Sequence, residues 1–241
     1  MDKALGLAPD RSLRDSPMAQ NAVFSELLYL HPELERHLDQ TEFSTRDFIV
    51  RPDQTIENVV FPVSGLVATV IAVGSDFVEA GMIGADGAIG GSVVLGGRRH
   101  SIFALGCIPG AAHVLPAAVL FNLAKDDETV RTLFFRSESW LLVQAQQIAA
   151  CNGKHAVSQR FCHWLLRAAD IHGNESLFAT QELIAQLLGV QRASISPCAS
   201  ELQDKGYIKY SRGVISIIDR EMLEAQACEC YRMIRKRRPG L

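Results

Sequence analysis

Residues 179–192 read Ala-Thr-Gln-Glu-Leu-Ile-Ala-Gln-Leu-Leu-Gly-Val-Gln-Arg and give the strongest structural signal in the chain. Thr180 is a good N-cap for a helix over Gln181–Leu188, because its hydroxyl can accept a hydrogen bond from a free backbone N–H. Gly189 ends this helix with a residue that adopts a left-handed conformation without strain. A second helix is predicted over 191–205. Its apolar positions repeat at helical spacing and are Ile195, Ala199 and Leu202.

A β-hairpin follows the two helices, with β-rich runs over 207–210 and 214–218 and Gly213 at its tip. Helix, tight turn, helix and hairpin make a winged helix-turn-helix, whose second helix enters the major groove of DNA. Arg192 can donate two hydrogen bonds to guanine, and Arg212 on the wing suits a phosphate. The alternative is that these polar residues only coat an exposed helix. The predicted DNA contacts are Thr180, Gln191, Arg192, Ser194, Ser196 and Arg212.

Two residues of the second helix complicate this interpretation. Inside a helix, Pro197 removes a backbone hydrogen bond and costs about 3 kcal/mol unless it lies in the first turn. A helix that starts near Ser194 tolerates it, whereas one that starts at Gln191 should be kinked. Cys198 is a candidate redox switch beside DNA, and a small core-facing residue is the alternative.

The front of the chain has a different pattern. After a predicted helix over 21–40, in which Pro32 starts a second turn, glycine-containing turns separate short β-rich runs over 48–50, 59–61, 66–71 and 111–115, which indicates an antiparallel roll or barrel. A short helix over 117–124 and a long helix then follow, and Asn152-Gly153 should end the long one. Its heptad stripe, Phe134, Leu141 and Ile148, predicts a dimer seam, with packing on the chain's own β domain as the alternative. A further helix is predicted over 154–171, ending at His172-Gly173-Asn174.

These patterns predict an α+β protein in four parts. They are a flexible tail over 1–20, a β-roll sensor domain over 21–126, a dimerisation helix over 127–152 and a winged helix-turn-helix domain over 153–241.

Charge and composition narrow the class of protein. The net charge is −3, but residues 154–241 carry 13 Lys and Arg against 9 Asp and Glu, while residues 1–153 carry 11 against 18. A basic rear half suits nucleic acid. No apolar stretch approaches the roughly 20 residues of a membrane span and no signal core is present, so we expect a cytoplasmic protein without membrane contact.

No enzymatic chemistry or metal site is predicted. The chain contains none of the common hydrolase, metalloprotease or phosphate-loop motifs. Its six cysteines are scattered, and the one close pair, Cys228-Glu229-Cys230, is spaced more tightly than the Cys-x-x-Cys of metal knuckles.

Residues 179–192 resemble the helix-turn-helix signature of the Crp/Fnr transcription regulators. The likeness extends through Asn152, His155, Arg160 and Trp164-Leu-Leu, through Arg212-Gly-Val-Ile-Ser-Ile and Ala227-Cys-Glu-Cys-Tyr231, and forward to Phe61-Pro-Val-Ser-Gly65. The resemblance implies a cyclic-nucleotide-binding-like β-roll, a long dimerisation helix and a winged helix. It also implies a homodimer on palindromic double-stranded DNA, with RNA polymerase as a further candidate partner.

The chain departs from that family in its sensor positions. Cyclic-nucleotide-binding members present Gly-Glu-Leu to the ribose and Arg-Ser or Arg-Thr to the phosphate. The matching positions here read Gly90-Gly91-Ser92 and His100-Ser101, and Gly91 has no side chain to bind a ribose hydroxyl, which argues against cyclic AMP. No cysteine precedes Cys107, which argues against the family's N-terminal iron–sulfur cluster. A haem ligand could be sought in His100 or His113, although a lone histidine in a β-roll is more often structural. The predicted effector-pocket residues are Gly90, Gly91, Arg98, Arg99, His100 and Ser101.

The predicted recognition helix also lacks the glutamate and second arginine that many members carry, so its preferred half-site should differ. The effector, and whether binding activates or represses, stay open. The rival prediction is a ligand-sensing or protein-interaction module whose winged helix has lost DNA binding.

Overall fold

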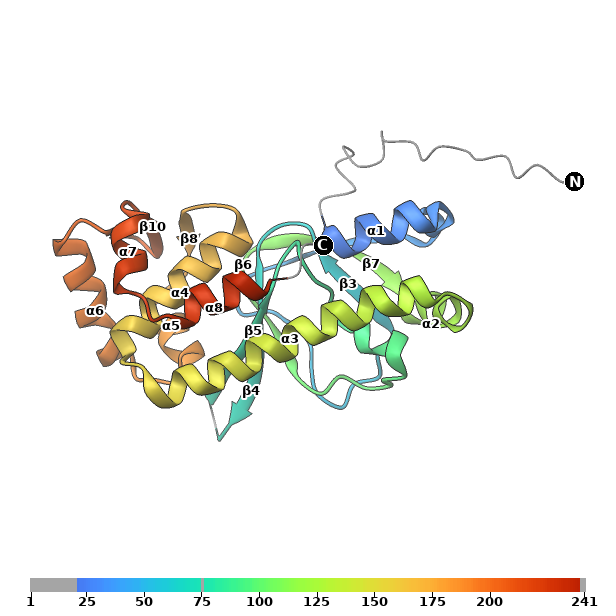
Figure 1. Ribbon diagram of the computed structural model, residues 1–241, viewed down its shortest axis with the longest axis horizontal. Coiled ribbons are helices and arrows are strands. Elements are labelled where there is room, and N and C mark those ends of the chain that lie inside the picture. The colour runs from blue at the N-terminus through green and yellow to red at the C-terminus, as the bar shows by residue number, and fades with distance from the viewer. Residues whose placement is uncertain (1–20, 75, 239–241) are drawn as a thin grey trace, which may run out of the picture.

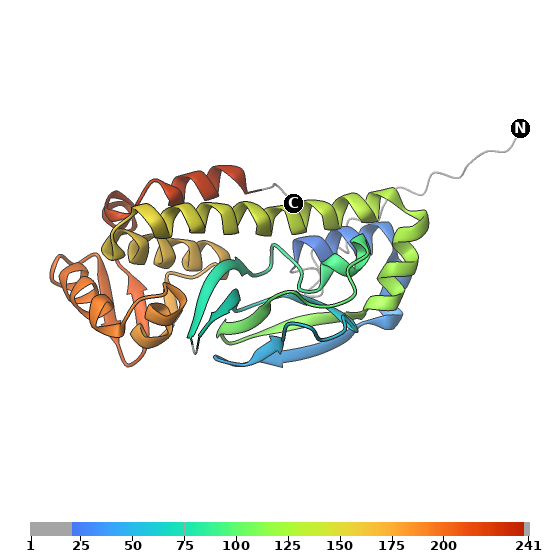
Figure 2. The same cartoon turned by 90° about the horizontal axis from the view of Figure 1, so that it is seen from below.

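The computed structural model describes residues 21–74 and 76–238. A β-rich part and a helical C-terminal part lie at opposite ends of an elongated molecule, and one long helix, α3 (Glu128–Lys154), runs along both of them (Figures 1 and 2). The predicted α+β class and the order of the parts are confirmed. The predicted tail over 1–20 lies outside the described residues.

The β part is an antiparallel roll of two sheets, with strand orders β1-β7-β3 and β2-β6-β4-β5. Gly65 turns the chain between the sheets with φ +78°, and a Cβ there would lie 2.6 Å from the carbonyl oxygen of Ile108. Only glycine fits this close approach. The strands are β1 (Asp39–Phe43), β2 (Phe48–Val50), β3 (Asn58–Pro62), β4 (Leu66–Val73), β5 (Asp76–Ile83), β6 (Phe103–Ile108) and β7 (Gly110–Pro116).

The helix predicted over 21–40 is interrupted. Helix α1 (Ala22–Leu30) stops before Pro32, a 3₁₀ helix η3 (Pro32–His37) follows, and the chain is already extended in β1. Proline at the first position of η3 cannot donate the hydrogen bond that would continue α1. The prediction is therefore wrong at its end, where pairing with β7 holds Asp39 and Gln40 in a sheet.

Helix α2 (Ala117–Asp126) leads into α3, whose N-cap Asp127 accepts hydrogen bonds from the backbone N–H groups of Thr129 and Val130. A short 3₁₀ helix, η4 (Gly91–Leu95), packs against α2 and α3. Helix α3 continues through Asn152-Gly153 to Lys154, so the predicted break lies two residues too early. Glycine costs a helix only about 1 kcal/mol, and the last turn tolerates it.

The predicted dimer seam faces the wrong way. Phe134 is fully buried in the core between α3 and the roll, Leu141 packs against a second core of the roll, and only 9% of Ile148 is exposed. The open alternative, packing on the chain's own β domain, describes these three residues. The neighbouring stripe on α3 is exposed instead, with Phe135 62% and Leu142 58% accessible.

The C-terminal part contains a small sheet of strand order β8-β10-β9 surrounded by helices. Its central helix, α4, ends at Gly173 in a left-handed conformation, as the sequence predicts. The elements are α4 (Val157–His172), β8 (Ser176–Phe178), α5 (Gln181–Leu187), α6 (Arg192–Asp204), β9 (Ile208–Ser211), β10 (Val214–Ile217), α7 (Arg220–Gln226) and α8 (Cys230–Arg237). Helix α8 returns alongside α3 (Figures 1 and 2).

A buried polar network joins the roll, α3 and the C-terminal part. The Glu79 carboxylate in β5 accepts hydrogen bonds from Trp164 Nε1 at 2.7 Å and Arg167 Nη1 at 3.1 Å, which both come from α4. Arg167 also donates to Gln144 Oε1 of α3 at 2.5 Å, and Gln144 exchanges hydrogen bonds with the Met82 backbone. Three parts of the fold therefore meet at one charged pair.

Within residues 21–74 and 76–238, no helix combines the length and the apolar character needed to cross a bilayer.

Candidate nucleic-acid interface

Helix α5 begins and ends as the sequence predicts. Thr180 Oγ1 caps it by accepting a hydrogen bond from the Leu183 backbone N–H at 3.1 Å. Gly189 follows the helix with φ +64°, and its Cα lies close to Val78 of β5, which a Cβ would approach to 3.2 Å. The tight turn thus leaves no space for a side chain on the side of the roll.

Helix α6 is amphipathic and presents its N-terminal end to solvent. Ile195, Ala199 and Leu202 are buried against α4 and α5. The opposite side of the first turn is open. Gln191, Arg192 and Ser194 are exposed, and Gln191 occupies the N-cap position without a side-chain capping bond. These side chains are available to a partner.

Ser196 has a different place from the other predicted contacts. It is half-buried, and its hydroxyl donates to Gln181 Oε1 at 2.9 Å and approaches the Arg192 carbonyl at 3.4 Å. The Ser196–Gln181 bond ties α6 to the first turn of α5. Ser196 therefore fixes the angle between the two helices.

The hairpin β9–β10 forms the wing. Its turn residues Arg212 and Gly213 have φ values of +50° and +80°, as a two-residue hairpin turn with left-handed residues requires. A Cβ on Gly213 would lie 4.0 Å from Thr180 Cγ2, so the wing tip reaches the start of α5. These contacts join the wing tip, the start of α5 and the first turn of α6 into one face. It belongs to the end of the molecule away from the N-terminal helix α1 (Figure 1).

The charges on this face favour an anion. Among the residues that the structure describes, no carboxylate forms an ion pair with Arg192 or Arg212. The nearest acid on α5, Glu182, lies 3.8 Å from Arg46 of the roll. Two exposed guanidinium groups beside helix N-termini suit phosphate and base edges.

Pro197 lies in the interior of α6. Of the two alternatives, the structure has the earlier start: the helix begins at Arg192 with Gln191 as N-cap, so Pro197 lies beyond the first turn. The helix nevertheless remains continuous to Asp204. Proline has no backbone N–H to donate to the carbonyl of Ala193, four residues earlier. Pro197 and Ala193 are both exposed, so water can donate a hydrogen bond to this carbonyl instead.

Cys198 does not have the properties of a reactive thiol. It is half-buried, and its Sγ donates to the Ser194 carbonyl at 3.2 Å. Burial, together with the charge of Glu201, raises the pKa of Cys198. A raised pKa reduces the thiolate fraction on which oxidation depends, so the structure favours the alternative of a packing residue.

The predicted effector-pocket residues do not line one cavity. A Cβ on Gly91 would lie 2.7 Å from Glu138 Oε1 and 2.8 Å from Phe134 Cδ1, so α3 fills the space that a ribose-binding glutamate would need. Arg99 binds the Asp53 carbonyl, and the His100 backbone pairs with residues 53 and 54. Of the six residues, only His100 borders the large open groove described next.

That groove has a volume of about 850 Å³ and runs over β1, β2 and the loop before β3. Its rim carries four carboxylates, from Asp39, Glu42, Asp47 and Glu57. Such a rim is electrostatically unfavourable for a phosphate group.

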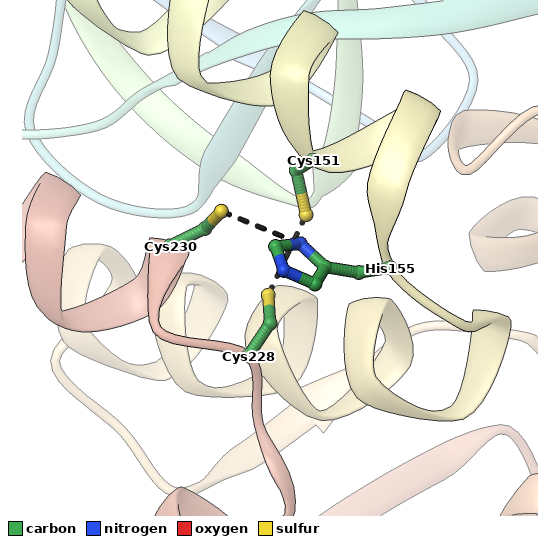
Figure 3. A group of neighbouring side chains, drawn as sticks. All are labelled: Cys151, His155, Cys228 and Cys230. Atoms are coloured by element: carbon green, nitrogen blue, oxygen red, sulfur yellow. Dashed lines mark hydrogen bonds between the residues drawn. The ribbon is translucent and has the colours of Figure 1, made fainter.

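Sequence reasoning missed a cluster at the junction of α3 and α8. Cys151, His155, Cys228 and Cys230 place one ligand atom each within 4.8 Å of one another (Figure 3). The signal was present as Cys-x-x-x-His and Cys-x-Cys, but 72 residues separate His155 from Cys228. Only the fold brings the two halves together.

The architecture is that of a winged helix-turn-helix attached to a β-roll by a long helix. Residues 159–226 match the model of the Crp-like helix-turn-helix domain. The chain thus carries a Crp-like helix-turn-helix domain, and over these residues the predicted resemblance to the Crp/Fnr family is confirmed.

Solved structures of this family share the fold over most of the chain. FixK2 from Bradyrhizobium japonicum superposes with a TM-score of 0.68 at 16% identity, covering 79% of this chain and 98% of its own. A putative Crp/Fnr-family regulator from Eubacterium rectale superposes with a TM-score of 0.67 at 18% identity, covering 86% of this chain and 98% of its own. TTHB099, a CRP-family regulator from Thermus thermophilus, superposes with a TM-score of 0.66 at 16% identity, covering 78% of this chain and 96% of its own. A search of curated proteins gave no significant sequence match.

Proposed function

We propose that this protein is a sequence-specific DNA-binding transcription regulator that acts as a homodimer and has no catalytic role. One observation carries the proposal: the N-terminal turn of α6, with Gln191, Arg192 and Ser194, is exposed beside the wing tip Arg212. The helix is not buried against the roll, so it can enter a major groove without rearrangement of its own domain.

The roles of the side chains follow from their chemistry. Arg192 would read a guanine through its two-pronged guanidinium, and Gln191 and Ser194 are placed beside it. Arg212 and the first turn of α5 at Thr180 would contact phosphates, which fix position without reading sequence. Ser196 would act indirectly by holding α6 on α5 through Gln181.

Dimerisation is assigned to the exposed stripe of α3. Phe135, Leu142 and Ala149 are spaced by seven residues, and all three are exposed. This spacing suits a coiled-coil seam between two copies of α3. Two-fold symmetry would then present two α6 helices to a palindromic site, about 34 Å apart along DNA. RNA polymerase stays a candidate partner.

The sensor is proposed to respond to something other than cyclic AMP. The ribose position at Gly91 is closed by Phe134 and Glu138, and the groove over β1 and β2 is rimmed with carboxylates. Helix α3 fills the space at Gly91 and also presents the proposed seam. A conformational change in the roll would therefore alter the dimer as well.

Fluorescence anisotropy against a pool of genomic fragments, with the salt concentration varied, tests the proposal. We expect a sequence preference and a steep loss of affinity with salt, about 0.9 logarithmic units per decade for each phosphate neutralised. Arg192→Ala should weaken the preferred site by about 1–3 kcal/mol and relax its sequence preference. Arg212→Ala should weaken all sequences alike and reduce the salt slope by about one unit.

Arg36→Ala is the matched control, because it removes the same charge from an exposed position in the sensor part. It should leave both measurements unchanged. Binding that is flat with respect to sequence and salt, and equal in Arg192→Ala, would support the rival interaction module and contradict the regulator.

A further inference from the structure

Four metal-binding side chains converge where the long helix meets the C-terminal helix (Figure 3). Cys151 lies in the last turn of α3, and His155 is the residue that caps this helix. Cys228 and Cys230 lie at the start of α8. The three cysteines form a small buried cluster of their own, with 2–3% of each exposed.

The separations suit one metal ion. Cys151 Sγ lies 3.5 Å from Cys228 Sγ, and Cys230 Sγ lies 3.5 Å from His155 Nδ1. In a tetrahedral zinc site with Zn–S of about 2.3 Å and Zn–N of about 2.0–2.1 Å, ligand atoms lie roughly 3.5–3.8 Å apart. All four ligand atoms here lie within 4.8 Å, so an ion at their centre needs only small side-chain rotations.

The surrounding groups orient the ligands. His155 Nε2 lies 3.2 Å from the Glu229 carboxylate, which favours the tautomer that carries its proton on Nε2 and leaves the Nδ1 lone pair facing the cysteines. Carboxylate–histidine pairs of this kind are usual around zinc. Gln147 Nε2 donates to Cys230 Sγ at 3.1 Å. His163 Nδ1 lies 3.7 Å from Cys151 Sγ and 3.6 Å from Cys228 Sγ, so it can donate to either sulfur.

We propose that Cys151, His155, Cys228 and Cys230 bind one Zn²⁺ ion, which fastens the winged-helix domain to the end of α3. Three sulfurs and one imidazole form a closed ligand set, as structural zinc sites have. A two-metal cluster would need these ligands divided between two ions, whereas all four ligand atoms surround one centre. The ion would link two segments that are otherwise joined only through the 72 residues between His155 and Cys228.

Purified full-length protein, kept reduced and supplied with Zn²⁺, tests the site by elemental analysis. We expect about one zinc per chain. Co²⁺ in place of zinc should give the thiolate charge-transfer and intense visible bands of tetrahedral sulfur ligation. Cys228→Ser and Cys151→Ser should lose the metal, whereas Cys198→Ser, outside the cluster, should retain it in full.

His155 allows a test that does not depend on loss alone. His155→Cys should retain zinc, because four sulfurs also form a structural site, whereas His155→Ala should not. Glu229→Ala should weaken zinc affinity by about 10–100-fold. Chelation of the wild type should lower its melting temperature, and added zinc should restore it. This last measurement uses only the wild-type protein, so it does not depend on whether a variant folds.

Three results would overturn the proposal. They are reduced protein without zinc that takes up neither Zn²⁺ nor Co²⁺, iron with acid-labile sulfide in place of zinc, and a Cys151–Cys228 disulfide in protein that binds no metal after reduction. None of these readouts involves DNA, so they stand apart from the test of the regulator.

Discussion

Glu138 illustrates how single residues shape the sensor. Its carboxylate comes from α3 and lies against Gly91, where a Cβ would approach Glu138 Oε1 to 2.7 Å. Burial raises the pKa of Glu138 to about 7, although a hydrogen bond from the Ser92 backbone opposes the rise. The same close packing against Gly91 therefore creates a carboxyl group whose pKa lies near neutral pH.

The first prediction concerns stability against pH. Because the folded-state pKa of Glu138 exceeds its ordinary value of 4.5, the folded protein holds this proton more tightly than the unfolded chain. Its contribution to the unfolding free energy should fall as pH rises from about 4.5 through 7, by about 3 kcal/mol at most, and level off above. Urea unfolding across that range measures it.

Glu138→Gln should flatten this part of the pH profile and stabilise the protein at pH 8. Glu128→Gln, which changes an exposed carboxylate at the start of the same helix, is the control and should keep the wild-type slope. An identical slope in wild type and Glu138→Gln would show that Glu138 does not titrate in this pH range.

Helix α3 has two apolar faces one residue out of phase. Phe134 is fully buried within the chain, while its neighbour Phe135 is 62% exposed. Both stripes repeat every seven residues, so periodicity alone fits either as the seam. Packing against the roll decides between them, since a side chain already in one core cannot contact a second copy.

The second prediction separates the two faces. Leu142→Glu should shift the protein to monomers with little change in its unfolding free energy per monomer, because a charge at a seam position is not desolvated in the monomer. Phe134→Ala should lower the unfolding free energy by about 3–5 kcal/mol through loss of core packing. Light scattering and urea unfolding measure the two effects.

Phe178→Glu serves as the control for Leu142→Glu, because Phe178 is 59% exposed but lies on β8. It should leave the oligomeric state unchanged. A dimer that survives Leu142→Glu combined with Phe135→Glu would exclude this face of α3 as the seam.

The whole molecule is coupled through Glu79 and Arg167. Their side chains are about 5% exposed and join β5 to α4, with Gln144 of α3 bonded to the same arginine. Desolvation raises the pKa of Glu79, while Arg167 and Trp164 oppose the rise. A buried pair of this kind is costly to break from one side, because the remaining charge loses its partner.

The third prediction is a double-mutant cycle across this pair. Glu79→Ala and Arg167→Ala should each cost about 3–5 kcal/mol of unfolding free energy. The double variant should cost less than their sum by about 0.5–3 kcal/mol. Calorimetry of Glu79→Ala should also show the roll and the winged helix melting in separate transitions.

The Arg46–Glu182 pair offers a matched comparison, since it joins the same two parts at 3.8 Å but is exposed. Its coupling energy should lie at about 0–1 kcal/mol. If the unfolding free-energy losses of Glu79→Ala and Arg167→Ala simply add, with no more coupling energy than at the exposed pair, the buried network does not couple the domains.

Most of the fold could be predicted because its signals are local. The cap Thr180, the turn glycine Gly189 and the wing tip Gly213 each act within a few residues, so the winged helix could be placed almost to its boundaries. Strands β1, β5, β6 and β8 were missed. β1 carries a polar run whose strand conformation depends on pairing with β7, about 70 residues later.

The candidate sites divide in the same way. The sequence alone determined which end of α6 is exposed, because the helix presents its first turn through backbone geometry and a short apolar repeat. Only the tertiary structure decided which stripe of α3 is free, that Gly91 is closed by Glu138, and that Cys151 meets Cys228 across 77 positions. Those outcomes depend on which surfaces lose water together when distant segments pack, and no local pattern records that choice.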